Sequence, residues 1–380
     1  MKFLASLFVA CAVMAVPVSA TAQTSPVPAP NVAAKSFVLF DYQTSQLLAS
    51  EKPAERVEPA SLTKLMTAYV VFTAIKQKKI TTAQTIPVST KAWKAEGSRM
   101  FIEPNKPVTA DELMHGMIIQ SGNDASIALA EAAAGSEELF AQVMNKEAKR
   151  LGMKNTNFVN VTGLPNKEHY STAEDMALLA AAIIRDFPEF FPLYSQKDYT
   201  YNNITQPNRN RLLWIDKFVD GMKTGHTEAA GFCLVSTAKR GERRLISVML
   251  GTASDNARTV ESQKLLNYGF QFFDTQKLYS KGQSIASLEL FKGEKEKISA
   301  GFQQDLFLSL PREQFAKLKA TLSTTQPLLA PLSAGQKIGS MKVTIDDKTI
   351  AEYPVVALET VPLAGFFGRT WDSIKLLWKK

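Results

Sequence analysis

The first residues with types and spacing suited to chemistry lie in the run Ser61-Leu62-Thr63-Lys64. Residues three apart share one face of a helix, so the amine of Lys64 can reach the hydroxyl of Ser61. A serine hydroxyl is a weak nucleophile, and a lysine can act as its base when burial or a second cation lowers the lysine pKa toward neutrality. Pro59 suits the start of a helix, where main-chain N–H groups and the helix dipole favour negative charge on a substrate oxygen. The pair predicts an active-serine hydrolase that attacks an amide or peptide carbonyl.

A second group, Ser121-Gly122-Asn123, lies between a predicted helix that ends near Ile119 and another that begins at Asp124. From a loop at that place, the Ser121 hydroxyl can relay protons and the Asn123 side chain can bind a substrate amide. Taken alone, these residues are also those of an ordinary helix N-terminal cap. They become candidate site residues only in combination with other groups.

A third group, Lys223-Thr224-Gly225, stands directly before a predicted pair of strands. Lys223 would place a second cation near Lys64 and so lower the pKa of that amine. Thr224 can bind a substrate carboxylate, and Gly225 lets a ligand approach the backbone closely. Taken alone, this group would be a turn.

The three groups together are more specific than any one of them. A serine and a lysine three apart are expected about once by chance in a chain of 380 residues, and Ser236 and Lys239 repeat the spacing. That second pair falls in a predicted strand, where residues i and i+3 point to opposite faces, so the two groups cannot act together. Ser61 and Lys64 pass this test, and the SxN and KTG groups follow them in order.

Composition argues against several other kinds of site. The sequence has three histidines and none stands in an HExxH-type array, so we expect neither a metal site nor a cofactor. The formal charge of +8 would suit nucleic acid, anionic lipid or an acidic polymer. No zinc-finger spacing, GxxxxGK[ST] loop or block of basic residues accompanies that charge, so we expect no nucleic-acid partner.

Residues 1–22 have the features of a secretory signal peptide. Lys2 supplies a positive start, an apolar run extends from Phe3 to Val16, and the small residues up to Ala22 suit signal peptidase. The apolar run is short for a membrane-spanning helix, and Pro17 follows it directly. We therefore expect this segment to be removed and the mature enzyme to work outside the cytoplasm.

Cysteine usage agrees with this expectation. Cys11 would leave with the signal peptide, so Cys233 would remain without an intramolecular disulfide partner. Cys233 lies in an apolar, strand-like stretch, which indicates a buried and inert thiol rather than a nucleophile.

The spacing of apolar residues predicts a helical middle between two groups of strands in a catalytic domain at residues 23–279. A hairpin is expected at 36–41 and 46–49, and two strands at 231–238 and 244–251. Strands at both ends suggest one antiparallel sheet with the helices packed against it, an α+β fold (α/β in looser usage). The helices are expected at 62–75, 110–119, 125–134, 138–151 and 172–184, and Thr109 with Glu112 forms a capping box for the second of them.

Two smaller parts follow. Residues 280–360 alternate short strands with Gly, Pro and Ser, which is the spacing of a small all-β domain, and they contain no catalytic group. Residues 361–380 end in an amphipathic helix that is too short and too charged to span a bilayer but can lie at a membrane surface. The alternative for this helix is docking on the protein's own core. Its apolar face carries Phe366, Phe367, Trp371, Ile374, Leu377 and Trp378, opposite Arg369, Asp372, Lys375, Lys379 and Lys380.

The chain resembles the low-molecular-mass penicillin-binding proteins, which are serine-type D-alanyl-D-alanine carboxypeptidases of the bacterial periplasm with a β-lactamase-like catalytic domain. The resemblance rests on Pro59 to Thr67, Ser121 to Ala125 and Asp220 to Thr227. It extends over the β domain and the amphipathic end with Gly365-Phe366-Phe367-Gly368.

The resemblance implies a role for each catalytic group. Ser61 would be acylated by the penultimate D-Ala carbonyl of a muramyl pentapeptide, the terminal D-Ala would leave, and water would hydrolyse the ester. Lys64 would be the general base, and Ser121 with Lys223 would complete the proton network. The main-chain N–H groups of Ser61 and His226 would form the oxyanion hole.

The resemblance also implies substrate contacts and partners. Asn123 would bind the substrate amide, and Thr224 with Arg258 the terminal carboxylate, next to Gly225. Arg209 is a weaker candidate for that carboxylate, and for Arg258 a surface arginine before a helix is an equal alternative. The implied partners are the peptidoglycan pentapeptide stem, β-lactam antibiotics and, through the terminal helix, the surface of the inner membrane.

Three other functions compete. A class A β-lactamase shares the motifs, but no matching acidic loop motif precedes Lys223, and a β domain and membrane helix would be superfluous in it. A D,D-endopeptidase, which cuts D-Ala cross-links, uses closely related chemistry, and only the family resemblance distinguishes the carboxypeptidase from it. A non-catalytic wall-binding protein would not need the intact Ser61 and Lys64.

Overall fold

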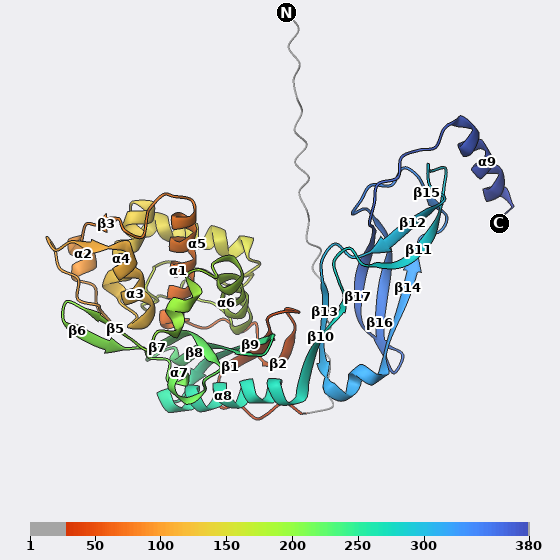
Figure 1. Cartoon of the computed structure of the whole chain (residues 1–380). Coiled ribbons are helices and arrows are strands. Elements are labelled where there is room, and N and C mark those ends of the chain that lie inside the picture. Colours follow the sequence, from red (N-terminus) through yellow and green to blue (C-terminus); the bar gives the residue numbers. More distant parts are fainter. Residues whose placement is uncertain (1–27, 379–380) are drawn as a thin grey trace, which may run out of the picture. The chain divides into compact units, whose positions relative to one another are not determined.

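The structure is a computed structural model that describes residues 28–378, and it divides into two compact units (Figure 1). The first unit contains the described residues up to Gln276 together with Leu308–Arg312, and the second contains Lys277–Phe307 and the residues from Glu313 onward. The predicted signal peptide and the final two lysines lie outside the described residues.

One five-stranded antiparallel sheet runs through the first unit in the order β2-β1-β9-β8-β7. Its strands are β1 (Ser36–Asp41), β2 (Leu47–Glu51), β7 (Val219–Thr227), β8 (Gly231–Arg240) and β9 (Arg243–Thr252). Ser36 on β1 pairs with Leu250 on β9, and Asp41 with Leu245. The prediction of one sheet built from the two ends of the domain is therefore confirmed.

Helices fill the sequence between β2 and β7, as predicted. Polar side chains cap several of them: Thr109 and Glu112 form the expected capping box of α3, and Thr172 accepts a hydrogen bond at the start of α6. The helical elements there are η1 (Ala60–Thr63), α1 (Lys64–Lys76), α2 (Thr90–Trp93), α3 (Ala110–Ile119), α4 (Asn123–Ala134), α5 (Glu137–Arg150), α6 (Ala173–Asp186), η2 (Phe191–Ser195) and α7 (Leu212–Ile215), and α8 (Asp255–Phe272) follows β9. Two small two-stranded sheets lie among them: β3 (Thr85–Ile86) with β4 (Val108–Thr109), which flank α2 in the sequence, and the hairpin of β5 (Asp198–Tyr201) with β6 (Ile204–Pro207).

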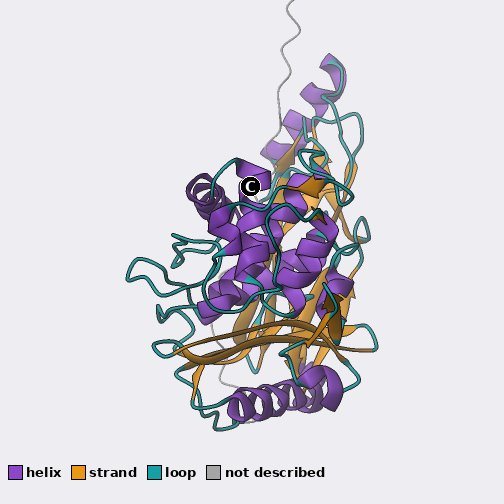
Figure 2. Cartoon of the chain, turned by 90° about the vertical axis from the view of Figure 1, so that its left-hand side faces the viewer, coloured by secondary structure: helices purple, strands orange, loops and turns teal. Residues whose placement is uncertain are grey.

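The sheet separates two apolar cores because successive side chains of a strand point to opposite faces. On β1, Val38 and Phe40 pack into the core shared with helices α1 to α6. Phe37 and Leu39 pack into the second core, which includes Leu265 and its neighbours on α8. Figures 1 and 2 show the result: α8 lies along one face of the sheet, on the side where α7 also packs, and helices α1 to α6 cover the opposite face.

Two elements differ from the sequence prediction. The segment around Lys223 is a strand rather than a turn, and β7 forms the edge of the sheet beside β8. Its two glycines and its polar residues hide the alternation that marks a half-buried strand. Arg258 does not precede a helix at the surface, because it lies within α8 and is buried.

Cys233 lies in the middle of β8 and is fully buried. Its thiol donates a weak hydrogen bond to the carbonyl of Ala230, and burial raises its pKa to about 11. The prediction that this thiol is buried is confirmed, and its raised pKa disfavours the reactive thiolate.

The second unit is an all-β domain, as predicted. Its main sheet has the order β14-β16-β17-β12-β11-β15, and its core includes Ile298, Val355 and Ala357. Asp346 and Asp347 both adopt the left-handed conformation, which suits the tight turn between β16 and β17. The strands are β11 (Ser284–Phe291), β12 (Lys297–Gly301), β14 (Leu318–Thr324), β15 (Leu328–Leu329), β16 (Lys337–Ile345) and β17 (Lys348–Ala357); β10 (Phe273–Tyr279) pairs separately with β13 (Leu306–Pro311), and η3 (Arg312–Lys317) follows β13.

Helix α9 (Phe366–Leu377) ends the described chain beside β11. The carboxylate of Asp372 accepts a hydrogen bond from the main-chain N–H of Lys292, just after β11. The apolar side chains of α9 are exposed: Phe366, Phe367, Trp371, Ile374, Leu377 and, after its last residue, Trp378. In residues 28–378, no helix is long and apolar enough to cross a bilayer.

Candidate active site

Ser61 and Lys64 stand at the start of the central helix of the first unit. Ser61 lies in the short 3-10 turn η1, which leads directly into α1 at Lys64. The amine of Lys64 donates to the Ser61 hydroxyl at 3.0 Å and to the carbonyl of Thr162 at 2.7 Å. The lysine can therefore reach the serine, as its spacing predicts.

The environment of Lys64 favours the neutral amine. Its side chain is 1% exposed, and burial, followed by the positive charge of Arg209, lowers its pKa to about 7, while Asp124 opposes the shift. Near neutral pH a large fraction of Lys64 is unprotonated and can accept the proton of a serine hydroxyl.

Glycines bring the other segments close to the turn that carries Ser61. A methyl group on Gly225 of β7 would lie 3.0 Å from the carbonyl oxygen of Pro59 and 3.2 Å from the Cβ of Ala60. A methyl group on Gly163 would overlap the carbonyl of Ala60. Strand β7 and the loop at Gly163 thus pack directly on the turn. Gly225 makes room for the turn that carries Ser61, whereas from the sequence we expected it to make room for a ligand.

Ser121 and Asn123 lie at the junction of α3 and α4, and Asn123 is the first residue of α4 rather than part of a loop. The hydroxyl of Ser121 and the Oδ1 atom of Asn123 are buried and have no hydrogen-bond partner among the described residues. The Asn123 Nδ2 group donates to the carbonyl of Glu96 at 2.6 Å, which fixes the orientation of the amide. Buried unpaired acceptors of this kind are rare in folded proteins and mark places where a ligand or water binds.

The neighbouring Asp124 binds the backbone of residues 100–102 to the start of α4. Its buried carboxylate accepts main-chain N–H groups from Met100 at 3.0 Å, Phe101 at 2.8 Å and Ile102 at 3.3 Å. The main-chain N–H of Asn123 also donates to the carbonyl of Ser98 at 2.7 Å. These contacts fix the segment that determines the position of the Asn123 amide.

Lys223 is a second buried cation in the same cluster. Burial and the charges of Lys64, Arg209 and Arg258 hold its pKa well below the usual range of a lysine. Its amine donates to the carbonyl of Thr224 at 3.0 Å. Within residues 28–378 the Ser121 hydroxyl forms no hydrogen bond to either lysine, and Lys223 lies within electrostatic range of Lys64.

The two arginine candidates differ sharply. Arg258 is buried, and its guanidinium donates to the carbonyl of Gly225 at 3.0 Å and to the carboxylate of Asp255. Asp255 also binds Arg211 at 2.6 Å. Arg209 is exposed and makes no hydrogen bond or ion pair with any other described residue, so it is the better placed of the two to receive an anion.

Thr224 is buried beside Lys223 on β7. His226 follows on the same strand and is exposed, and its ring lies tilted against that of Phe232 with centroids 4.0 Å apart. The remaining candidates come from the later part of the first unit. Lys223, Thr224, Gly225 and His226 lie on β7, Arg258 lies on α8, and Arg209 precedes α7.

Sequence reasoning missed three contributors. The Thr162 contact comes from a main-chain carbonyl, which has no residue-type signature, although Asn160 and Gly163 mark a turn there. Asp124 looks like an ordinary helix-capping residue. His169, which in the sequence is only one of three scattered histidines, lies 2.7 Å from the Thr63 hydroxyl.

Comparisons with known proteins identify the family of the chain. A model of the D-alanyl-D-alanine carboxypeptidase peptidase family matches residues 21–254, and a model of the C-terminal domain of penicillin-binding protein 5 matches residues 273–363. D-alanyl-D-alanine carboxypeptidase DacC of Escherichia coli K12 is 43% identical over 366 residues, which cover 94% of this chain and 92% of that protein. DacA of Haemophilus influenzae is 42% identical over 354 residues, 91% of this chain and 90% of that protein.

Solved structures give the same result. Penicillin-binding protein 5 from Haemophilus influenzae superposes with a TM-score of 0.86 at 41% identity, over 88% of this chain and 99% of that chain. Penicillin-binding protein D2 from Listeria monocytogenes, solved in its cefotaxime-bound form, superposes with a TM-score of 0.60 at 29% identity, over 64% of this chain and all of that one (100%). The chain therefore belongs to the D-alanyl-D-alanine carboxypeptidase family of penicillin-binding proteins.

Proposed function

We propose that this protein is a serine-type D-alanyl-D-alanine carboxypeptidase that removes the terminal D-Ala from peptidoglycan pentapeptides through an acyl-enzyme on Ser61. The observation that carries the proposal is the contact between the Lys64 amine and the Ser61 hydroxyl at 3.0 Å, with the pKa of Lys64 lowered to about 7. Because a β-lactam presents the same reactive amide and carboxylate, penicillin acylates the same serine.

In the first step Lys64 accepts the proton of Ser61, and the serine oxygen bonds to the penultimate D-Ala carbonyl carbon. The main-chain N–H groups of Ser61 and His226 stabilise the resulting oxyanion. The bond from that carbon to the nitrogen of the terminal D-Ala then breaks, and the departing amine takes the proton that Lys64 accepted, relayed through Ser121 with Lys223. Water hydrolyses the ester and restores the serine.

Substrate binding uses the groups that the fold leaves unpaired. The Oδ1 atom of Asn123 can accept the N–H of a substrate amide, because its Nδ2 group is already committed to Glu96. Thr224 and the free guanidinium of Arg209 bind the terminal carboxylate beside Gly225. Arg258 contributes through the backbone of β7, since its guanidinium already contacts Gly225 and Asp255.

Mass spectrometry of penicillin-treated protein tests the proposal. We expect a single covalent adduct on the peptide that contains Ser61, none in Ser61→Ala, and a normal adduct in Ser236→Ala. Ser236 is the matched control because it has a lysine at the same spacing on strand β8. D-Ala release from a pentapeptide should disappear in Ser61→Ala while the melting temperature stays unchanged, and full residual turnover would refute the assignment.

The same preparation separates the competing activities. A long-lived acyl-enzyme with labelled penicillin supports the carboxypeptidase, whereas rapid turnover of penicillin indicates a β-lactamase. Release of D-Ala from a pentapeptide but not cleavage of a D-Ala cross-linked dimer distinguishes the carboxypeptidase from an endopeptidase.

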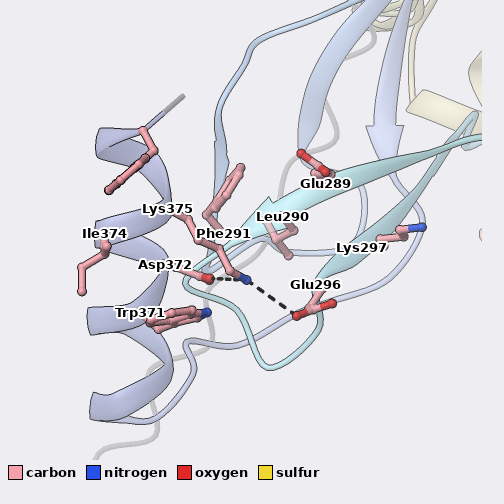
Figure 3. A pocket seen from close by; sticks show the side chains of 10 residues that line it. Glu289, Leu290, Phe291, Glu296, Lys297, Trp371, Asp372, Ile374 and Lys375 are labelled. Carbon is pink, nitrogen blue, oxygen red and sulfur yellow. Dashed lines mark ion pairs between the residues drawn. The ribbon is translucent and has the colours of Figure 1, made fainter. Parts of the chain in front are cut away.

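We also propose that the enzyme works in the periplasm, with residues 1–22 as a signal peptide, 23–279 as the catalytic domain, 280–360 as the β domain and 361–380 as a membrane-surface helix. The apolar side chains of α9 support the last assignment, because Phe367 is 88% exposed and Trp378 87%. Trp371 and Lys375 of α9 line a pocket together with Leu290 and Glu296, as Figure 3 shows. The volume of this pocket is about 590 Å³.

Binding to lipid vesicles tests the membrane proposal. Phe367→Ala/Trp371→Ala should lower the bound fraction on vesicles that contain anionic phosphatidylglycerol, because each aromatic side chain loses buried apolar area in the interface. Trp214→Ala is the matched control, since Trp214 is a half-exposed tryptophan on α7 in the first unit. Equal binding of all three proteins would contradict the proposal.

A further inference from the structure

A chain of hydrogen bonds runs through His169 to the turn that carries Ser61. His169 is 2% exposed, and its Nδ1 atom accepts the main-chain N–H of Val159 at 3.1 Å. Its Nε2 atom lies 2.7 Å from the hydroxyl of Thr63, which donates to the carbonyl of Ala60 at 2.8 Å. None of these side chains takes part in the reaction steps described above.

The donors and acceptors of this chain have one consistent direction. Because the main-chain N–H of Val159 can only donate, Nδ1 of His169 carries no proton, and the proton of a neutral imidazole is on Nε2. The single hydrogen of the Thr63 hydroxyl points to Ala60, so the Thr63 oxygen accepts from Nε2. Every buried polar atom in this series of hydrogen bonds then has a partner, and protonation of Nδ1 would break the bond from the Val159 N–H.

The surroundings of His169 agree with a neutral ring. Burial, and then the positive charge of Lys64, lower its pKa to about 4. The edge of the Phe158 ring packs against the imidazole with centroids 5.6 Å apart, which limits rotation of the ring.

The end of the chain bears directly on Ser61. A trans peptide is planar, so the carbonyl of Ala60 and the N–H of Ser61 belong to one rigid unit and point in opposite directions. Ala60 has a φ of +47°, a conformation that costs a residue with a side chain on the order of 1 kcal/mol. A hydrogen bond to the Ala60 carbonyl therefore fixes the direction of the Ser61 N–H at a place where the backbone would otherwise relax.

The same histidine also holds the loop that supports the base. Val159 begins the segment in which the carbonyl of Val161 accepts from Thr67 at 2.7 Å and the carbonyl of Thr162 accepts from Lys64 at 2.7 Å. His169 thus connects that segment to the turn of Ser61.

We propose that His169 is a positioning residue for acylation: through the Thr63 hydroxyl it holds the Ala60–Ser61 peptide so that the Ser61 N–H points at the substrate oxyanion. This inference rests on the proposed function, because it needs Ser61 to form an acyl-enzyme. The proposal does not require His169 to contact the substrate.

The tautomer of His169 is the first test, and it does not depend on activity. Long-range nitrogen–proton NMR spectra of the full chain show three histidines, and His169→Gln assigns the signal. We expect a neutral ring with the proton on Nε2 throughout pH 5 to 8. A ring that is protonated at pH 6, or that carries its proton on Nδ1, overturns the inference even if the enzyme acylates normally.

Acylation kinetics with fluorescent penicillin are the second test. The side-chain amide introduced by His169→Gln can reach the former Nε2 position and donate to Thr63, whereas the shorter amide of His169→Asn can serve only Val159. We expect the acylation rate constant at saturating penicillin to decrease by no more than about fivefold in His169→Gln and by roughly 10- to 100-fold in His169→Asn. The dissociation constant of penicillin should change little in either variant. Equal losses in both variants, or a loss confined to the dissociation constant, contradict the proposal.

Thr63→Val is the partner variant: it removes the hydroxyl and retains the volume of the side chain. It also tests the proposal if His169→Asn does not fold. Because Thr63 and His169 belong to one series of hydrogen bonds, the double variant Thr63→Val/His169→Asn should be acylated no more slowly than the slower single variant. Thr63→Ser, which keeps the hydroxyl, should be acylated at the wild-type rate. If the rate losses of the two single variants multiply in the double variant, the two residues act independently and the proposal is wrong. If the wild type itself forms no adduct at Ser61, the proposed function fails, while the NMR result still decides whether the hydrogen-bonded chain exists.

Discussion

The lowered pKa of Lys64 makes the pH dependence of acylation a quantitative prediction. With a pKa of about 7, about 1% of Lys64 is neutral at pH 5, about half at pH 7 and about 99% at pH 9. The rate constant of acylation by saturating penicillin should therefore rise about 50-fold from pH 5 to pH 7 and less than about twofold from pH 7 to pH 9. An ordinary lysine, with a pKa of 10.5, would leave about a thousandfold less neutral amine at pH 7.

Stopped-flow measurement with fluorescent penicillin gives this profile, because the penicillin carboxylate stays ionised throughout. Since the charge of Arg209 lowers the pKa of Lys64, Arg209→Gln should move the rising limb to higher pH. Arg211→Gln is the matched control: Arg211 is also an arginine in this segment, but it pairs with Asp255 and does not shift Lys64. A profile that is flat from pH 5 to 9, a limb near pH 10, or equal shifts in both variants would refute the assignment of Lys64 as the base.

Three further predictions concern stability and the support of the site. Gly163→Ala should destabilise the fold and slow acylation because its methyl group would overlap the Ala60 carbonyl, whereas Gly152→Ala, with the same φ of +83° and open space around it, should cost only about 1 kcal/mol in thermal unfolding. Asp124→Asn should lower the free energy of unfolding by about 1–3 kcal/mol and raise the penicillin dissociation constant, because an amide replaces a carboxylate that accepts three loop N–H groups; unchanged values of both quantities would contradict this role. The pKa of His169 is about 4 when folded and 6.5 when unfolded, so its contribution to stability is complete above pH 6.5 and is lost, by about 3 kcal/mol, as the pH falls to 4; denaturant unfolding of His169→Gln should show a shallower loss over that range.

The catalytic pair was predictable because its signal is local. A helix places residues i and i+3 on one face, so Ser61 and Lys64 could be paired from spacing alone, and the decoy at Ser236 could be rejected because its segment has the pattern of a strand. The sheet was predictable for a related reason, since short continuous runs of apolar residues, buried on both faces of the sheet, mark β1, β8 and β9 at the two ends of the domain.

The remaining differences have physical causes. The first half of α8 buries Arg258, Thr259 and Ser262, so it lacks the apolar stripe that reveals a helix, and the sequence alone does not show that Arg258 lies inside one. Strand β7 resembles a turn in sequence because Gly221 and Gly225 are needed for close packing rather than for a bend.

Main-chain groups carry no signature at all. The carbonyl of Thr162 and the N–H of Ser61 depend on how the chain folds, and any residue except proline offers the same N–H. The hydrogen-bonded chain through His169 could not be found from sequence for this reason, since both of its ends are backbone atoms.

The pairing of β1 with β9 has a consequence for how the molecule forms. Phe37 lies opposite Met249, so the central pair of the sheet joins residues from nearly the full span of the first unit. Contacts of such high sequence separation slow folding, because a long loop must close before the contact stabilises anything. The neighbours of the Ser61 turn on β7 also come late in this unit, so we expect a chain that ends before β7 to be unable to form an acyl-enzyme.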